Sequence, residues 1–339
     1  MAVTIIDVAR EAKVSPSTVS RVIADSPRIS EQTKRKVREV MERLEYYPNF
    51  QARNLAAKST KTIGVIMSHS TSMAFQNPFF PEVIRGICAS AHSSQYGIYL
   101  STGGTEEEIH QEVVSMVQGR KVDGIILLYS RVNDRTMNYL KAEKFPFTMV
   151  GRPYKYENEI TYIDNDNRKI AHDVVNYLYQ LGHRQIAFIG GDLDFVVSRD
   201  RLEGYKQALE DANLTYSDAY FIHDQAFKAK ENEELHKMMQ LAAAPTAIVA
   251  HDDLIAYEII RCLEELSIHV PNHLSIISFN NHSLSAYVSP PLTSVDISIF
   301  ELGFEATNFL LEKVRDPNAA VTHHFVQTTL IERESCKNI

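Results

Sequence analysis

The sequence predicts an α/β protein: a small all-α head in front of a two-lobed body built on parallel sheets. Two observations carry this prediction. Residues 1–47 place apolar side chains at helical spacing, whereas from Thr62 to about residue 280 short strand-like runs alternate with helical stretches. Such alternation is typical of parallel sheets that helices cover on both faces. A length of 339 residues allows two or three compact units.

Charge divides along the chain at the same place. Residues 1–61 contain twelve Lys/Arg and seven Asp/Glu, a net charge of +5, and the rest of the chain carries −13. A basic head on an acidic body indicates that the head alone meets a polyanion. The alternative is a solvated basic segment without a partner.

The head is expected to contain three helices. The first covers Ile5 to Ala12. Ser15 can cap the second helix, and Pro16 at its first position loses no helical hydrogen bond. Ser30 can cap a third helix over about residues 31–45. Two short helices joined by a tight turn, with a third as support, form a helix-turn-helix unit.

The second helix indicates what this unit binds. Its aliphatic residues at 19, 22 and 23 turn inward, so small hydroxyls and an arginine remain outside. These side chains suit hydrogen bonding to base edges in a major groove. We therefore predict a DNA-binding head, against the alternative of a three-helix bundle that contacts no DNA. The outward residues are Pro16, Ser17, Ser20 and Arg21.

The body continues the alternation through TIGVIM, GIYLST, DGIILL, FTMV, QIAFIG, TAIVA and LSIISF. A helix from Ile299 to Val314, after PPLTSVDIS, is expected to return to the first lobe. Ligands of open α/β sheets bind beyond the carboxyl ends of the strands, so we expect a ligand site in the cleft between the lobes. The predicted divisions are a head at 1–47, a linker at 48–61 and a body at 62–339, with a first lobe of 62–161 plus 293–330 and a second lobe of 162–292.

Other classes of protein are disfavoured. No run of about 18 apolar residues would span a membrane, and the N-terminus lacks an export signal. Three scattered cysteines fit reduced thiols in a cytoplasm, where we expect the protein to reside. The HDD run at 251–253, the IGGD run at 189–192 and Ser198 lack the spacing of metal, phosphate-loop and nucleophile sites. We expect no enzyme activity, metal or cofactor.

A long ordered set of motifs resembles the lac repressor family of bacterial regulators. In the head the resemblance runs through D-V-A, V-S-x-x-T-V-S-R-V, T-x-x-K-V, L-x-Y-x-P-N and A-R-x-L. In the body, NPFFPEVIRGI, KVDGIILL, RLEGYKQAL, AHDDLIAYEIIRCL and SPPLTSVDI are similar to the periplasmic sugar-binding fold of these regulators. The resemblance implies base contacts at Pro16, Ser17 and Arg21, and phosphate contacts at Ser15, Thr18 and Thr33.

The segment PNFQARNLAAKS, residues 48–59, resembles the hinge of the family. A segment this short is unstable alone, so it is expected to fold on the operator. Leu55 matches the leucine that family members wedge between base pairs from the minor groove, and Asn49 and Arg53 are predicted to contact DNA beside it. The alternative is an ordinary linker whose leucine packs on the body.

The same resemblance implies the residues that bind an effector. Arg201 matches an arginine whose fork can bond two vicinal hydroxyls or a carboxylate. Asn280 stands where relatives often have aspartate, and its amide both donates and accepts. An aromatic ring at Phe79 or Phe80 can face the apolar side of a pyranose. Each residue could instead pack within its own lobe. The predicted set is Phe79, Phe80, Asp166, Phe195, Arg201, His251 and Asn280.

The function that the resemblance implies is a homodimeric repressor on a near-palindromic operator. A small sugar closes the lobes, the hinge unfolds and the DNA is released. Stretches such as GRPYKYENEITYIDNDN resemble members that control maltose operons, which implies maltose or a maltodextrin as effector. Two alternatives stay open: a global catabolite regulator of the same family that binds a phosphocarrier protein, and a stand-alone sugar-binding or transport protein.

Overall fold

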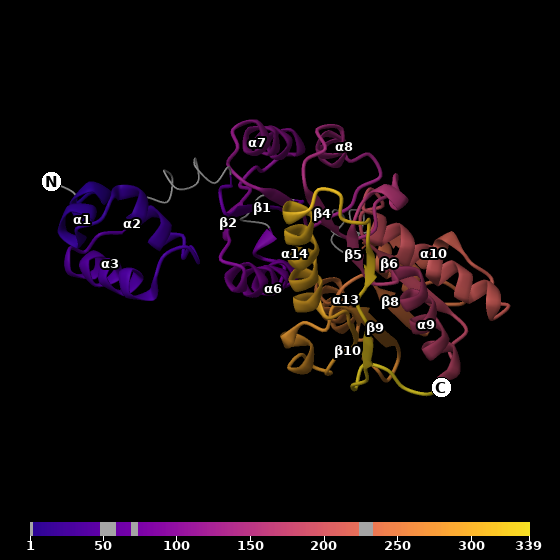
Figure 1. Cartoon of the computed structure of the whole chain (residues 1–339). Helices are drawn as coiled ribbons and strands as arrows, with labels where there is room; N and C mark the ends of the chain where they lie inside the picture. Colours follow the sequence, from indigo (N-terminus) through magenta and orange to yellow (C-terminus); the bar gives the residue numbers. More distant parts are fainter. Residues whose placement is uncertain (1–2, 48–58, 69–73, 224–232) are drawn as a thin grey trace. The chain divides into compact units, whose positions relative to one another are not determined.

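The computed structural model describes residues 3–47, 59–68, 74–223 and 233–339. The chain divides into two compact units, a head (Met1–Thr60) and a body (Lys61–Ile339). The division falls inside the linker that the sequence predicts at residues 48–61. Figure 1 shows a helical head and a body in which strands and helices alternate.

The described part of the head holds three helices: α1 (Ile5–Ala12), α2 (Pro16–Ile23) and α3 (Glu31–Arg43). Both predicted caps are confirmed, because the Oγ atoms of Ser15 and Ser30 accept the backbone N–H groups of Thr18 and Thr33 at 3.2 and 3.3 Å. Small aliphatic side chains fill the core between the helices, which lets three short elements pack closely. These side chains are Val8, Ala9, Ala12, Val19, Val22, Val37 and Val40.

The first sheet of the body is parallel throughout, in the order β11-β5-β4-β3-β1-β2. Its central strands β1, β3 and β4 are short and almost entirely buried, as parallel strands covered on both faces usually are, whereas the edge strands β2 and β11 are partly exposed. Their bounds are β1 (Thr62–Ile66), β2 (Gly97–Leu100), β3 (Gly124–Leu127), β4 (Phe147–Val150), β5 (Tyr162–Asp164) and β11 (His323–Phe325).

The second sheet has the order β12-β10-β9-β8-β6-β7 and is parallel except for β12, which pairs antiparallel with β10. Its strands are β6 (Ile186–Gly190), β7 (Phe221–His223), β8 (Ala247–Ala250), β9 (Ser275–Phe279), β10 (Thr293–Asp296) and β12 (Thr329–Ile331). We call the two sheets with their helices the first lobe and the second lobe.

Helices cover both faces of each sheet. In the first lobe, α6 (Phe79–Ser93) and α14 (Ile299–Arg315) share one core with the strands, and α7 (Glu106–Gln118) and α8 (Arg135–Ala142) share another. Figure 1 shows α14 close to α6, and the two helices touch through two glycines. In the second lobe the corresponding pairs are α9 (Asn167–Gln180) with α10 (Val196–Asp211), and α12 (Glu233–Met239) with α13 (Asp253–Glu265).

The lobe boundaries differ from those expected. Because β5 pairs with β4, the first crossing to the second lobe follows Asp164 rather than residue 161. Because β10 pairs with β9, residues 293–296 belong to the second lobe, and the chain returns only before α14. A further crossing separates β11 from β12, at residues 326–328. The expected return of the helix at 299–314 to the first lobe is confirmed.

Candidate functional site

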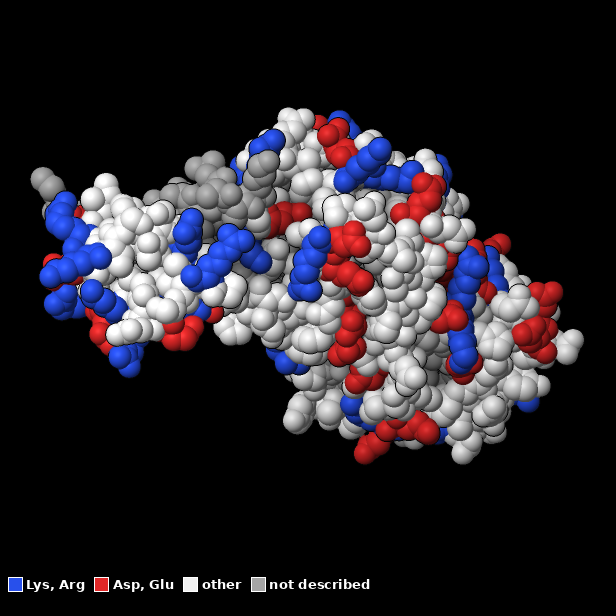
Figure 2. Space-filling model, viewed as in Figure 1, with Lys and Arg blue, Asp and Glu red and all other residues white. Residues whose placement is uncertain are grey.

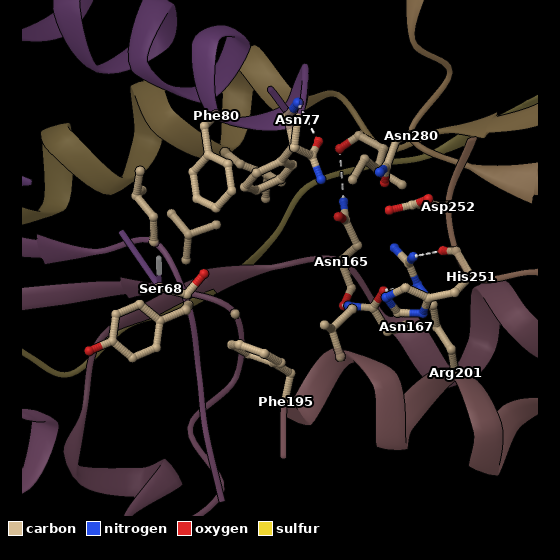
Figure 3. Close-up of a pocket in the computed structure, with 18 of the residues that line it drawn as sticks. Ser68, Asn77, Phe80, Asn165, Asn167, Phe195, Arg201, His251, Asp252 and Asn280 are labelled. Atoms are coloured by element: carbon tan, nitrogen blue, oxygen red, sulfur yellow. Dashed lines mark hydrogen bonds between the residues drawn. The ribbon is translucent and has the colours of Figure 1, made fainter. Parts of the chain in front are cut away.

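A cavity of about 430 Å³ lies between the lobes. Figure 3 shows the side chains that surround it. Many come from turns that directly follow β1, β3, β4 and β5 of the first sheet and β8, β9 and β10 of the second, and others come from helices α6, α10, α13 and α14. This is the end of the strands at which open α/β sheets bind ligands. The cavity therefore lies in the cleft that the sequence predicts for the ligand.

Arg201 provides the positive charge of the cavity. It stands in α10, where its side chain is buried and turns toward the second sheet. Its Nε donates to Asn167 Oδ1 at 3.0 Å and its Nη1 donates to the carbonyl oxygen of His251 at 2.6 Å. The guanidinium lies 4.2 Å from the centre of the Phe279 ring. Burial lowers the pKa of Arg201 to about 10, so the side chain stays charged at neutral pH.

Acidic side chains also line the cavity. Asp252 lines the cavity and caps α13, because its Oδ1 accepts the backbone N–H of Ile255 at 2.9 Å. Asp164 lies at the other side and accepts the N–H groups of Arg152 and Asn165. Burial raises the pKa of Asp252, and it raises the pKa of Asp164 to about 7. The walls can thus both donate to and accept from hydroxyl groups, as recognition of a sugar requires.

Aromatic rings form the apolar part of the wall. Phe79 and Phe80 begin α6, and their ring centres lie 5.4 Å apart at an interplanar angle of 89°. Phe195 enters from the second lobe, and Tyr129 stands beside it on the turn after β3. A cavity that combines a few convergent polar groups with aromatic faces is typical of small-ligand sites.

Asn280 follows β9 and reaches the cavity through an unusual backbone conformation. Its φ is +101°, and Asn281 also has a positive φ of 48°. Asparagine adopts such angles more readily than most residues. The backbone N–H of Asn280 donates to the carbonyl oxygen of Val295 at 2.9 Å, which holds the turn against β10. The Asn-Asn pair is therefore suited both to the turn and to polar contact with a ligand.

The structure brings six of the seven predicted effector residues around this cavity and leaves one outside. The six are Phe79, Phe80, Phe195, Arg201, His251 and Asn280. Asp166 is exposed and does not line the cavity; its Oδ1 caps α9 by accepting the N–H of Lys169 at 3.0 Å. Its neighbours Asn165 and Asn167 face the cavity instead.

Several cavity residues were missed from the sequence. Asn165 donates through Nδ2 to the carbonyl oxygens of Ile297 and Val326, both at 3.1 Å, so it also joins the crossing segments. The polar run DNDN held a signal, because three of its four residues, Asp164, Asn165 and Asn167, line the cavity. The other missed polar residues are Ser68, Gln76, Asn77, Ser130, Asp164, Asn167 and Glu258.

The second candidate site is the outer face of α2 in the head. Pro16, Ser17, Ser20 and Arg21 are all exposed there, as predicted. Many basic side chains of the head are held in ion pairs, for example Arg38 with Asp25 at 2.8 Å. Arg21 has no carboxylate partner within the described residues. Figure 2 shows Lys and Arg spread over the surface of the head.

The predicted phosphate-binding residues lie at helix N-termini. The hydroxyls of Ser15 and Thr18 are 2.9 Å apart at the start of α2, and the Thr33 hydroxyl is 2.9 Å from that of Ser30 at the start of α3. Helix N-termini favour anions such as phosphate. The predicted hinge contacts Asn49, Arg53 and Leu55 lie outside the described residues.

Two properties of the described parts of the chain bear on other functions. Within those parts, His, Cys, Asp and Glu nowhere form a group of three or more that could hold a metal ion. Over the same residues, no helix has the length and apolar character needed to cross a bilayer.

Comparison with known proteins finds relatives of both the head and the body. The profile of the bacterial regulatory proteins of the lacI family matches residues 4–49, and that of the periplasmic binding protein-like domain matches residues 175–336. The HTH-type transcriptional regulator MalR of Staphylococcus xylosus is 35% identical over 337 residues, which cover 99% of each chain. Catabolite control protein A of Priestia megaterium is 35% identical over 311 residues, 91% of this chain and 92% of that one. The solved complex of the transcriptional regulator CelR with cellobiose shares 27% identity and a TM-score of 0.76, covering 98% of this chain and 99% of that chain.

These relatives are regulators of transcription and not enzymes, and the similarity spans head and body alike. Membership of one family therefore accounts for both parts of the chain. These parts are the helix-turn-helix head and the two-lobed body with its cavity at the carboxyl ends of the strands. The chain belongs to the lacI family of bacterial regulatory proteins and is a DNA-binding regulator of transcription.

Proposed function

We propose that this regulator is a homodimeric repressor that a small neutral sugar, maltose or a maltodextrin, releases from a near-palindromic operator. The observation that carries the proposal is the cavity between the lobes, in which one buried arginine, three acidic side chains, several amides and aromatic rings converge. Such walls match the hydroxyls and the apolar faces of a pyranose. The relation to MalR and to a regulator solved with a disaccharide supports the choice of ligand.

In this proposal the head and hinge contact the DNA, and the cavity between the lobes binds the sugar. Arg21 reads a base edge, while Ser15, Thr18 and Thr33 hold phosphates and Leu55 of the hinge enters the minor groove. A sugar between the lobes binds more tightly when the lobes are closed. It shifts the equilibrium between open and closed lobes only by the difference in its affinity for these two states. A coupling free energy of about 1–3 kcal/mol gives a roughly 5- to 150-fold loss of operator affinity.

The dimer is supported by exposed apolar side chains on the second lobe. Leu284, within the short 3-10 helix Ser283–Ala286, is 54% exposed, and Tyr287, directly after this helix, is 84% exposed. Large exposed apolar groups that lie together are typical of interaction surfaces. A two-fold dimer would present two heads to the two halves of one operator.

The decisive experiment measures operator release with maltose, maltotriose and glucose in parallel. We expect maltose or maltotriose to release the DNA, and we expect Arg201→Ala to bind operator normally but to resist release. Arg199→Ala is the matched control, because Arg199 donates to the carbonyl oxygen of Leu193 and does not line the cavity. A normal response of the Arg201 variant would remove Arg201 from the effector site.

A second candidate function is global catabolite control through a phosphorylated carrier protein. The observation that favours it is the equal identity, 35%, to catabolite control protein A. Adding a serine-phosphorylated carrier protein to the same assay separates the two functions. Operator affinity that rises with the carrier and ignores maltose would support catabolite control instead.

A further inference from the structure

The two lobes are joined at the cavity by a short backbone bridge. The turn after β3 in the first lobe and the segment before α10 in the second lobe run antiparallel, with Arg131 opposite Phe195. The N–H of Val132 donates to the carbonyl oxygen of Asp194 at 2.9 Å, and the N–H of Val196 donates to that of Ser130 at 3.0 Å. Both hydrogen bonds join a segment of the first lobe to a segment of the second lobe.

Phe195 connects this bridge to the ligand site. Its backbone belongs to the second lobe, yet its side chain packs against the core of the first lobe that contains Tyr129 and Met137. The same ring lines the cavity, and Figure 3 shows it beside the other cavity residues. The first lobe therefore determines where this wall of the cavity stands.

Arg131 of the first lobe contacts the Phe195 ring. Its guanidinium lies 4.7 Å from the centre of the Phe195 ring, within the range of a cation–π interaction. Two first-lobe groups fix the guanidinium: Nη2 donates to the carbonyl oxygen of Ser68 at 3.3 Å, and Nη1 lies 3.5 Å from Glu106 Oε2. Only 22% of the Arg131 side chain is exposed, which limits screening by water.

We infer that Arg131 is a positioning residue for the effector: it holds Phe195 of the opposite lobe as a wall of the cavity and so couples ligand binding to lobe closure. The inference rests on the proposed function, because it assumes that the cavity binds the effector. Arg131 itself does not line the cavity. It acts through the ring, so a ligand that stacks on Phe195 is bound best when the bridge is formed.

The first test needs no ligand. In the full-length protein, hydrogen–deuterium exchange is followed at the amides of Val132 and Val196, which donate the two bridging hydrogen bonds. We expect Arg131→Ala to exchange both amides faster than the wild type, and Arg131→Lys, which keeps a cation over the ring, to exchange them at nearly the wild-type rate. Arg135→Ala is the control, because Arg135 pairs with Glu107 on the exposed surface of the same lobe. Unchanged exchange in Arg131→Ala would overturn the inference.

The second test is a double-mutant cycle with maltose as the probe. Calorimetry of the full chain should show that Arg131→Ala binds maltose on the order of 3- to 30-fold more weakly, the range of a partly desolvated cation–π contact. In a Phe195→Ala background the same change should have little further effect. Equal losses in both backgrounds would contradict the inference, because Arg131 would then act without the ring. Glu106→Gln removes the ion pair between Glu106 and Arg131, and so tests whether this ion pair alone accounts for the loss of maltose affinity.

The two tests separate this inference from the proposed function. If Arg131→Ala speeds exchange at the bridge while the wild type binds no sugar, the choice of effector fails and the interlobe role of Arg131 stands. If the wild type binds maltose but the Arg131 variant behaves like the wild type in both tests, the effector stands and the inference fails.

Discussion

At the scale of single residues, the proposed base contact of Arg21 can be tested directly. This side chain is exposed on α2 and, within the described residues, unpaired, so no ion pair must break before it meets a base. We expect Arg21→Ala to weaken operator binding by about 1–3 kcal/mol and to relax sequence preference. Fluorescence anisotropy with operator and scrambled DNA measures both effects. Arg10→Ala, which removes an exposed arginine already paired with Asp7, is the matched control. Undiminished preference for operator over scrambled DNA would contradict this role.

Asp164 makes the stability of the body depend on pH. Burial raises the pKa of its carboxyl to about 7 from an ordinary value of 3.8. The folded chain therefore holds a proton that the unfolded chain releases. The stabilisation by this proton is complete below about pH 4 and is lost as the pH rises through about 7. We expect the free energy of unfolding of the wild type, relative to Asp164→Asn, to fall from pH 4.5 to pH 8. Urea unfolding at several pH values measures it, and parallel curves for the two proteins would refute it.

The predictability of the site also varies from residue to residue. Arg201 and Phe79 could be located because each lies in a motif shared with the family. Asp166 and Asn165 are adjacent in one polar run, and the sequence could not show which of them faces the cleft. That choice depends on where β5 ends and α9 begins, because the first residue after a strand and the cap of the next helix point to different sides.

At the scale of elements, the contact between α6 and α14 depends on glycine. A Cβ atom at Gly303 would lie 2.1 Å from the carbonyl oxygen of Val83, and one at Gly86 would lie 2.0 Å from that of Phe300. Exchange of glycine for alanine inside a helix normally stabilises it by about 1 kcal/mol. Here we expect Gly303→Ala to destabilise the body by about 1–3 kcal/mol, because the helices must separate.

Urea unfolding of the Gly303 variant measures this cost. Gly97→Ala is its control, since the nearest atom to an added Cβ there is 3.7 Å away. A stabilised Gly303 variant would show that the two helices can move apart freely.

Elements differ in how well the sequence predicts them. The three helices of the head and their serine caps could be predicted because each signal is local. The membership of β10 in the second sheet could not, because a run such as TSVD has the same pattern beside either sheet. The sheet to which β10 belongs is set by its pairing with β9 and with the antiparallel strand β12. Both pairings join residues that are distant in sequence, so the residues of β10 alone do not indicate them.

At the scale of the whole molecule, head and body are separate compact units, and the proposed effector touches only the body. A ligand stabilises the unit that binds it, by about 2.7 kcal/mol at a hundred times its Kd. We expect differential scanning calorimetry of the full chain without DNA to show that maltose raises the Tm of the body and leaves the Tm of the head unchanged. Transitions that shift together would mean that the two units are coupled even without operator.

The path of the chain between the lobes has a consequence for biosynthesis. The helix that closes one face of the first lobe, α14, is encoded after nearly all of the second lobe. While the ribosome is still translating residues 165–296, the apolar faces of α6 and its neighbouring strands are without this cover. The lobe that emerges first therefore lacks this cover until most of the second lobe has been made, and the nascent polypeptide should need chaperone protection until residues 299–315 have left the exit tunnel.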